Sequence, residues 1–204
     1  MAITNGYCTL AQFKTLPEID STNATDDTFV EETITRISRE IDRECGKWFY
    51  ARTLTRTYDI PPDRQLDLDV PLLTVTTLTN GDATTIAATD YTLFDPNTSP
   101  YYAIRLKQSS SVIWLPDSDG NIQNVLSVAG TWGYVSRSAT DDRSVQLIRN
   151  TETLCLIWSL AEYKRRYGFG VEGKSTVTAA GVVITPTALP DSARMILESL
   201  KRVY

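Results

Sequence analysis

The sequence contains no histidine. Histidine is the commonest general base and the commonest transition-metal ligand in proteins, so its absence excludes a Ser–His or Cys–His catalytic pair and the usual zinc ligand. Cysteine is scarce as well, because Cys8, Cys45 and Cys155 are the only three and form no close pair along the chain. Cys45 and Cys155 lie in apolar helical patterns, and we therefore predict reduced, buried thiols.

Long hydrophobic runs are also missing. No stretch approaches the roughly 20 apolar residues that a membrane-spanning helix needs. The first residues, MAITNGYCTL, have neither the basic segment nor the apolar core of a signal peptide. We therefore expect synthesis in the cytoplasm and no association with a membrane.

Basic residues are fewer than acidic ones, at 20 against 25. The formal net charge is −5, and only residues 138–204, with 9 basic and 7 acidic side chains, have a basic surplus. A protein that reads nucleic-acid sequence usually has a basic stripe across its domain. This charge distribution does not indicate sequence-specific binding of nucleic acid.

The clearest pattern that is present predicts a one-sided helix over residues 26–49. Acidic side chains gather at its start, Thr28 and Glu31 have the spacing of a capping box, and Gly46 supplies a stop. Its apolar stripe consists of Val30, Ile34, Ile37, Ile41, Cys45 and Trp48. Such a stripe must pack against another part of the chain.

Three more helices are predicted. Residues 8–16 form a short one with Thr9 as its cap, and Pro17 ends it. Residues 142–167 form a helix that is apolar nearly all round in its middle, LCLIWSLA, which is typical of the centre of a bundle. A last helix from about Pro190 has a stripe made of Ala193, Ile196, Leu197, Leu200 and Tyr204.

Between the helices the sequence is rich in threonine and β-branched residues broken by turns, which predicts strands. Asn80-Gly81 is the strongest hairpin signal. The predicted strands are residues 53–60, 65–70, 73–79, 84–88, 91–94, 101–107, 112–115 and 122–128. With no helix between them, an antiparallel sandwich or small barrel is expected.

The predicted fold class is therefore α+β. Residues 1–50 and 138–204 are expected to form one discontinuous helical domain with long central helices. Residues 51–137 are expected to form an antiparallel β-sandwich or barrel-like insertion.

Two short segments match part of a known binding motif but lack the flanking elements or the ligand residue that the motif requires. GFGVEGKS, residues 168–175, matches a phosphate-binding P-loop, but it follows a predicted helix and precedes a β-branched segment, the reverse of the required order. DSDGN, residues 117–121, resembles the start of a calcium loop, but Val128 stands where a bidentate Glu is required. A loop and a plain turn are the favoured interpretations, and we expect no catalytic, cofactor-binding or metal-binding residues.

Several side chains have both a structural and a functional interpretation. Glu40 and Glu44 suit charge pairing with nearby arginines better than acid–base catalysis. Aromatic residues such as Trp114 and Trp132 suit core filling better than a sugar- or base-stacking face. Basic residues near the C-terminal end are either ordinary helix-end charges or a docking surface for an acidic partner, with Leu197, Leu200 and neighbouring apolar residues as anchors.

Several phrases of the sequence together resemble a known family. These are YCTLAQFK at residues 7–14, REIDRECGKWFYART at 39–53, QLDLDVPLLTVTTLTNGD at 65–82, DYTLF at 90–94 and LPDSARMILESLKRVY at 189–204. Their order is similar to that in the head-to-tail connector (adaptor, or head completion) proteins of tailed bacteriophages. Minimal members of this family are nearly all helical, so the β module is a departure.

The resemblance implies a structural virion protein of the neck, made in the bacterial host, and not an enzyme. Such proteins form a ring, usually of twelve copies, below the portal, extend the DNA channel and provide the attachment platform for the tail. The implied partners are the portal protein, neighbouring copies, a tail terminator or stopper protein, and genomic DNA that passes without sequence-specific binding. The family's use of its C-terminal region implies a portal contact through Arg165, Arg166, Arg194, Leu197, Leu200, Lys201, Arg202 and Tyr204.

Two other functions stay open from the sequence. A carbohydrate- or surface-binding β module on a helical stalk predicts a sugar-dependent change in the fluorescence of Trp114 or Trp132. A nucleotide hydrolase that uses Lys174 predicts ATP or GTP binding that is lost in Lys174→Ala.

Overall fold

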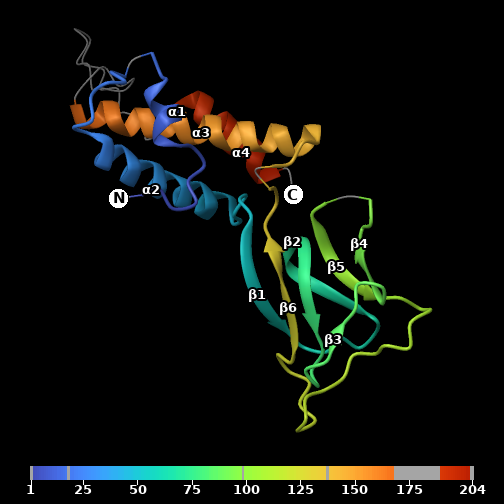
Figure 1. The fold of residues 1–204 in the computed structure, drawn as a ribbon. Helices are drawn as coiled ribbons and strands as arrows, with labels where there is room; N and C mark the ends of the chain where they lie inside the picture. The colour runs from blue at the N-terminus through green and yellow to red at the C-terminus, as the bar shows by residue number, and fades with distance from the viewer. Residues whose placement is uncertain (1, 18, 98, 137, 168–188, 203–204) are drawn as a thin grey trace, which may run out of the picture. The chain divides into compact units, whose positions relative to one another are not determined.

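The computed structural model describes residues 2–17, 19–97, 99–136, 138–167 and 189–202. The chain is α+β and divides into two compact units (Figure 1). The helical unit consists of Met1–Trp48 and Thr140–Tyr204, and the β unit consists of Phe49–Ala139.

In its described residues, the helical unit contains four helices: α1 (Leu10–Lys14), α2 (Asp27–Cys45), α3 (Asp142–Tyr167) and α4 (Asp191–Arg202). The predicted stripe of α2 is buried at Val30, Ile34, Ile37 and Ile41, as its spacing requires. α2 packs against α3, and α4 packs against both. Asp26 lies beside Tyr163, and Ser38 lies beside Cys155, so α2 and α3 are antiparallel neighbours.

The ends of the first two helices follow local signals, with one exception. Gly46 ends α2 in the left-handed conformation, with φ of 66°, as expected of a C-cap glycine. Thr9 caps α1 in a capping box with Gln12. The capping box predicted for Thr28 is wrong, because Thr28 lies inside α2, which begins at Asp27, and the N-cap, Asp26, makes no side-chain cap hydrogen bond.

α3 has the predicted bounds, but only one of its faces is fully covered by the described residues. Leu154, Cys155 and Ser159 are buried. The apolar side chains between and beside them keep partial exposure; these are Leu156, Ile157, Trp158 and Leu160. The sequence predicts that α3 is buried on all sides at the centre of a bundle. In the described part of the chain, other residues bury only one face of α3.

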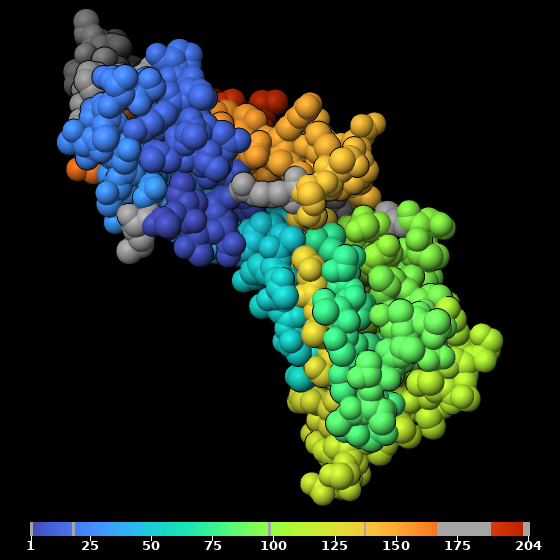
Figure 2. Space-filling view, viewed as in Figure 1, coloured from blue at the N-terminus to red at the C-terminus, as the bar shows by residue number. Residues whose placement is uncertain are grey.

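The β unit is one six-stranded antiparallel sheet. Its strands are β1 (Arg52–Tyr58), β2 (Gln65–Thr79), β3 (Thr85–Ile86), β4 (Tyr91–Phe94), β5 (Tyr101–Leu106) and β6 (Leu126–Trp132). The order is β1-β6-β2-β5-β4, and β3 pairs with β2 across the predicted Asn80-Gly81 turn. In Figure 2 the yellow stripe of β6 lies between the cyan β1 and the green β2. An open sheet therefore replaces the expected sandwich or barrel.

The long strand β2 joins two segments that the sequence predicts as separate strands. Its first part pairs with β5 and its second part with β6, with irregular register between Asp67 and Leu72 and again beyond Leu72. Pro71 lies at this change and offers no N–H to a ladder, although its carbonyl accepts from Gly133 N at 2.9 Å. Leu72, at this change of partner, lies in the same core as Ile104 of β5 and Trp132 of β6.

The strand predicted at residues 112–115 is wrong. This segment belongs to no strand and is held by side-chain hydrogen bonds and by one backbone hydrogen bond, from the Gly81 amide to the Leu115 carbonyl at 3.1 Å. Arg64 donates to the Val112 carbonyl at 2.8 Å, and Asn80 donates to the Ile113 carbonyl at 2.9 Å. β6 begins at Leu126 and not at Ile122, because residues 117–125 form turns and coil.

Candidate partner-binding surfaces

The end of α3 carries an exposed basic surface made of Lys164, Arg165 and Arg166, here called the α3 basic end. Arg165 and Arg166 are exposed. Glu162 pairs with Arg165 at 2.9 Å and with Arg36 of α2 at 3.3 Å, while Arg166 stacks over the Phe29 ring at 4.1 Å. These contacts hold the side chains in place without removing their charge from solvent, which suits recognition of an acidic partner.

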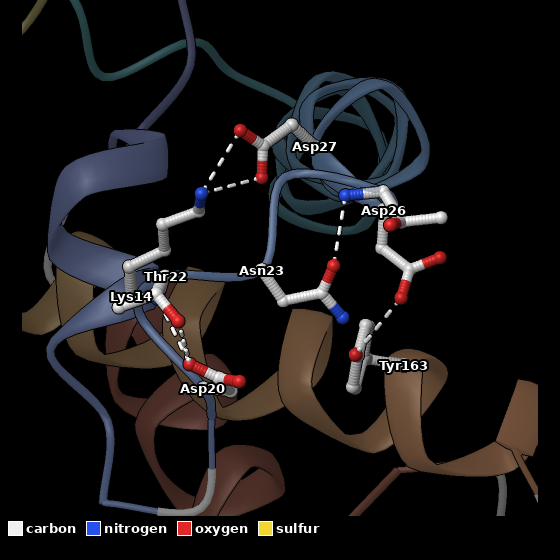
Figure 3. A network of polar contacts seen from close by, with 8 residues as sticks. Lys14, Asp20, Thr22, Asn23, Asp26, Asp27 and Tyr163 are labelled. Carbon is white, nitrogen blue, oxygen red and sulfur yellow. Dashed lines mark hydrogen bonds and ion pairs between the residues drawn. The ribbon is translucent and has the colours of Figure 1, made fainter.

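A polar network fixes the neighbouring start of α2 (Figure 3). The Tyr163 hydroxyl donates to Asp26 at 3.2 Å, and Lys14 of α1 pairs with Asp27 at 2.6 Å. In the connecting loop, Thr22 donates to Asp20, and these hydrogen bonds lower the pKa of the Asp20 carboxyl. The network links α1, α2 and α3. It therefore fixes the position of the last turn of α3, which carries the α3 basic end.

α4 divides its side chains between the core and the surface. Leu197 and Leu200 are 5% and 0% exposed, so they lie in the core of the helical unit. A contact of these two residues with a partner stays a prediction. Arg194 is exposed and pairs loosely with Asp191 at 3.8 Å. Met195 is 75% exposed and is an apolar surface residue that the sequence analysis missed, because it falls outside the stripe.

The residues expected to contact a portal do not form one patch. Lys201 pairs with Glu44 near the end of α2, whereas Arg166 lies over Phe29 in its first turn. At about 1.5 Å per residue these two positions of α2 are roughly 20 Å apart. The side chain of Arg202 and all of Tyr204 lie outside the described residues. The structure brings together Arg165 and Arg166, and their contact with a partner stays a prediction.

The tertiary fold also brings together two thiols that are far apart in the sequence. Cys8 Sγ lies 3.2 Å from Cys155 Sγ, and both residues are buried free cysteines. The Cys155 sulfur also lies 3.5 Å from the Ser38 hydroxyl. The predicted burial of Cys8 and Cys155 is confirmed, whereas their reduced state stays a prediction and their proximity had no signal in the sequence.

The β unit contains an open groove of about 530 Å³ beside β1 and the start of β2. Its lining includes four carboxylates, from Asp59, Asp63, Asp67 and Asp69. Tyr58 donates to Asp69 at 2.8 Å, and Arg56 forms an ion pair with the same carboxylate. Burial acts to raise the pKa of Asp69, but the hydrogen bonds from Tyr58 and Arg56 and the guanidinium charge outweigh it, so the pKa is lowered. The groove is therefore anionic at neutral pH.

The other sequence motifs have structural explanations where the structure describes them. Asp117 accepts hydrogen bonds from the Asp119 and Asn121 amides at 3.0 and 2.8 Å, as in a plain turn. No group of metal-binding residues occurs in the described parts of the chain. The P-loop string at residues 168–175, including Lys174, lies outside them.

The paired carboxylates and the tryptophans also fit their structural interpretation. Glu40 pairs with Arg43, and Glu44 pairs with Lys201. Trp132 is 0% exposed and donates to the Leu54 carbonyl at 3.0 Å, and Trp114 is 9% exposed. Neither ring offers an open face for stacking a sugar, so the core-filling interpretation is confirmed.

Among the described residues, no helix is both long enough and apolar enough to cross a membrane.

No known family model matches the sequence, and no curated protein matches it. Several chains of solved structures share the fold, among them the following two. One is described as the neck of an empty gene transfer agent (GTA) particle computed with C6 symmetry, with a TM-score of 0.57, 16% identity and coverage of 100% of this chain and 94% of that chain. The other is described as the virion of a native GTA particle, with a TM-score of 0.53, 15% identity and the same coverage. This chain therefore has, over its whole length, the fold of a protein found in the neck of a phage-like particle.

Proposed function

We propose that the chain is a structural virion protein of the neck, a head-to-tail connector that forms a ring below the portal. The ring continues the DNA channel and offers the attachment platform for the tail. Its partners are the portal protein, neighbouring copies and a tail terminator or stopper protein, and the chain has no enzymatic role. The ring contains about twelve copies, as the resemblance to connector proteins implies.

The observation that carries this proposal is the likeness of fold across both units. The chain is covered completely by the GTA neck structure, so the likeness extends to the β unit that minimal connectors lack. The order of helical and β segments independently resembles connector proteins. We accordingly propose that residues 1–50 and 138–204 are the connector domain and that residues 51–137 are an inserted domain.

The helical unit has exposed apolar and basic side chains that suit contacts with neighbouring copies and with the portal. A closed ring needs two different, complementary faces on each copy. The partly exposed apolar side chains of α3 and the exposed Met195 suit contacts with neighbouring copies. The exposed α3 basic end suits an acidic surface of the portal. A net charge of −5 suits a channel through which DNA must slide without binding.

The first experiment measures the mass of the purified chain, alone and mixed with its cognate portal, by native mass spectrometry. We expect a ring of about twelve copies, or monomers that join portal rings in matching number. A chain that stays monomeric and ignores the portal would contradict the connector role.

The second experiment tests the α3 basic end. Arg165→Glu combined with Arg166→Glu is expected to abolish co-assembly with the portal, because both charges are reversed on an exposed surface. Arg149→Glu, an exposed position in the first half of α3, is the matched control and should leave co-assembly unchanged. Equal loss in both variants, or in neither, would remove the α3 basic end from the portal contact.

A further inference from the structure

Two buried thiols face each other inside the helical unit. The sulfur atoms of Cys8 and Cys155 are 3.2 Å apart, and 147 residues separate them in the sequence. The exposed fractions of these residues are 1% and 0%. A disulfide needs two sulfurs within reach of each other, and this pair meets that condition with little movement.

The position of Cys8 is fixed by the segment before it. The Tyr7 amide donates to Ser38 Oγ at 3.0 Å, and the Tyr7 hydroxyl donates to Asp42, so the segment is attached to α2 at two points. Gly6 lies so close to α2 that an added Cβ would lie 3.2 Å from Ile34 Cγ2. These contacts seat the Cys8 side chain between α2 and α3.

The position of Cys155 is fixed by the core of α3. Its sulfur lies 3.5 Å from Ser38 Oγ and 4.0 Å from Ser159 Oγ. The hydrogen bond from the Cys8 thiol lowers the pKa of Cys155, against the effect of burial. Its neighbours therefore favour the thiolate, which is the reactive form of cysteine.

We propose that Cys8 and Cys155 are an oxidative modification site, at which hydrogen peroxide converts the two thiols into an intramolecular disulfide. The Cys155 sulfur attacks a peroxide oxygen, the O–O bond breaks, and a sulfenic acid and one water are formed. The Cys8 sulfur then attacks the sulfenic sulfur, the S–O bond breaks, and the S–S bond and a second water are formed. The two thiols lose two electrons and two protons in total, and the peroxide is reduced to two waters.

The third cysteine differs from this pair. Burial raises the pKa of Cys45 to about 11, so its thiol stays protonated at neutral pH and reacts slowly. Burial of Cys8 and Cys155 also selects the oxidant, because a small peroxide reaches such sulfurs more easily than a bulky disulfide reagent does.

The bond would join the segment before α1 to the middle of α3. A virion protein is made in a reducing cytoplasm and later released into an oxidising medium, so the bond would form in the finished particle. This timing rests on the proposed function, whereas the chemistry at the two sulfurs does not.

The test uses full-length protein with Cys45→Ser, purified with a reductant that is then removed. After treatment with hydrogen peroxide, we expect an intact mass lower by two hydrogen atoms and a Cys8–Cys155 linked peptide in a non-reducing digest. Closing so long a loop should also raise the melting temperature by about 5 °C or more. The same treatment of Cys8→Ser and Cys155→Ser should give no loss of hydrogen.

An unchanged mass, or added oxygen without a linked peptide, would overturn the proposal. The wild-type chain provides a second sample if Cys45→Ser folds poorly, because peptide mapping separates the three cysteines. The measurement needs no portal, so its failure is distinct from failure of the connector role.

Discussion

Replacing Leu200 with alanine tests whether α4 is part of the helical core. Leu200 is 0% exposed, and α4 packs against both α2 and α3. Removing a fully buried leucine side chain costs about 3 kcal/mol, from lost burial and from the cavity left behind. The better helix propensity of alanine returns only a few tenths of a kcal/mol. Leu200→Ala should therefore remove about a third of a typical stability of about 10 kcal/mol.

Met195→Ala is the matched control in the same helix. Met195 is 75% exposed, so its truncation should change the free energy of unfolding by less than about 0.5 kcal/mol. The two variants therefore separate a core position from a surface position at nearly the same change in side-chain size.

Urea unfolding followed by far-UV circular dichroism measures the difference. With a slope of about 2 kcal/mol per molar urea, the midpoint of Leu200→Ala should fall by about 1.5 M, and that of Met195→Ala should not move. If the Leu200→Ala midpoint stays within about 0.2 M of the wild type, α4 is not held by this side chain. Equal shifts in both variants would refute the division of α4 into a core face and a surface face.

Two further predictions concern the β unit. Gly130→Ala should destabilise it by about 2 kcal/mol in thermal or urea unfolding, because the added Cβ would lie 2.2 Å from the Thr74 carbonyl oxygen; an unchanged midpoint would show that β2 and β6 approach less closely. Because the pKa of Asp69 is lower in the folded chain than its ordinary value of 3.8, the stability that this group contributes is present above that value and is lost as pH falls below it. Urea midpoints between pH 2 and 5 should therefore fall less steeply in Asp69→Asn than in the wild type, and parallel curves would show that the contacts with Tyr58 and Arg56 do not favour the folded state.

Local patterns were enough to predict most of the elements. The stripe of α2, its stop at Gly46, the bounds of α3 and the hairpin at Asn80-Gly81 all agree with the structure. Each depends on residues within a few positions of one another, because helical periodicity and turn chemistry are local properties. The basic residues at the end of α3 were identified for the same reason, as charges beside a helix terminus.

Tertiary contacts decided the rest. β2 is one continuous strand because it pairs with both β5 and β6, and contacts from Arg64, Asn80 and Gly81, distant in the sequence, hold residues 112–115 without a ladder. The packing of α4 buries Leu197 and Leu200, which an amphipathic stripe alone cannot assign to a core or to a partner. The antiparallel pairing of α2 and α3 likewise places Cys155 beside Cys8, because proximity across 147 residues depends on how helices pack and not on their own sequences.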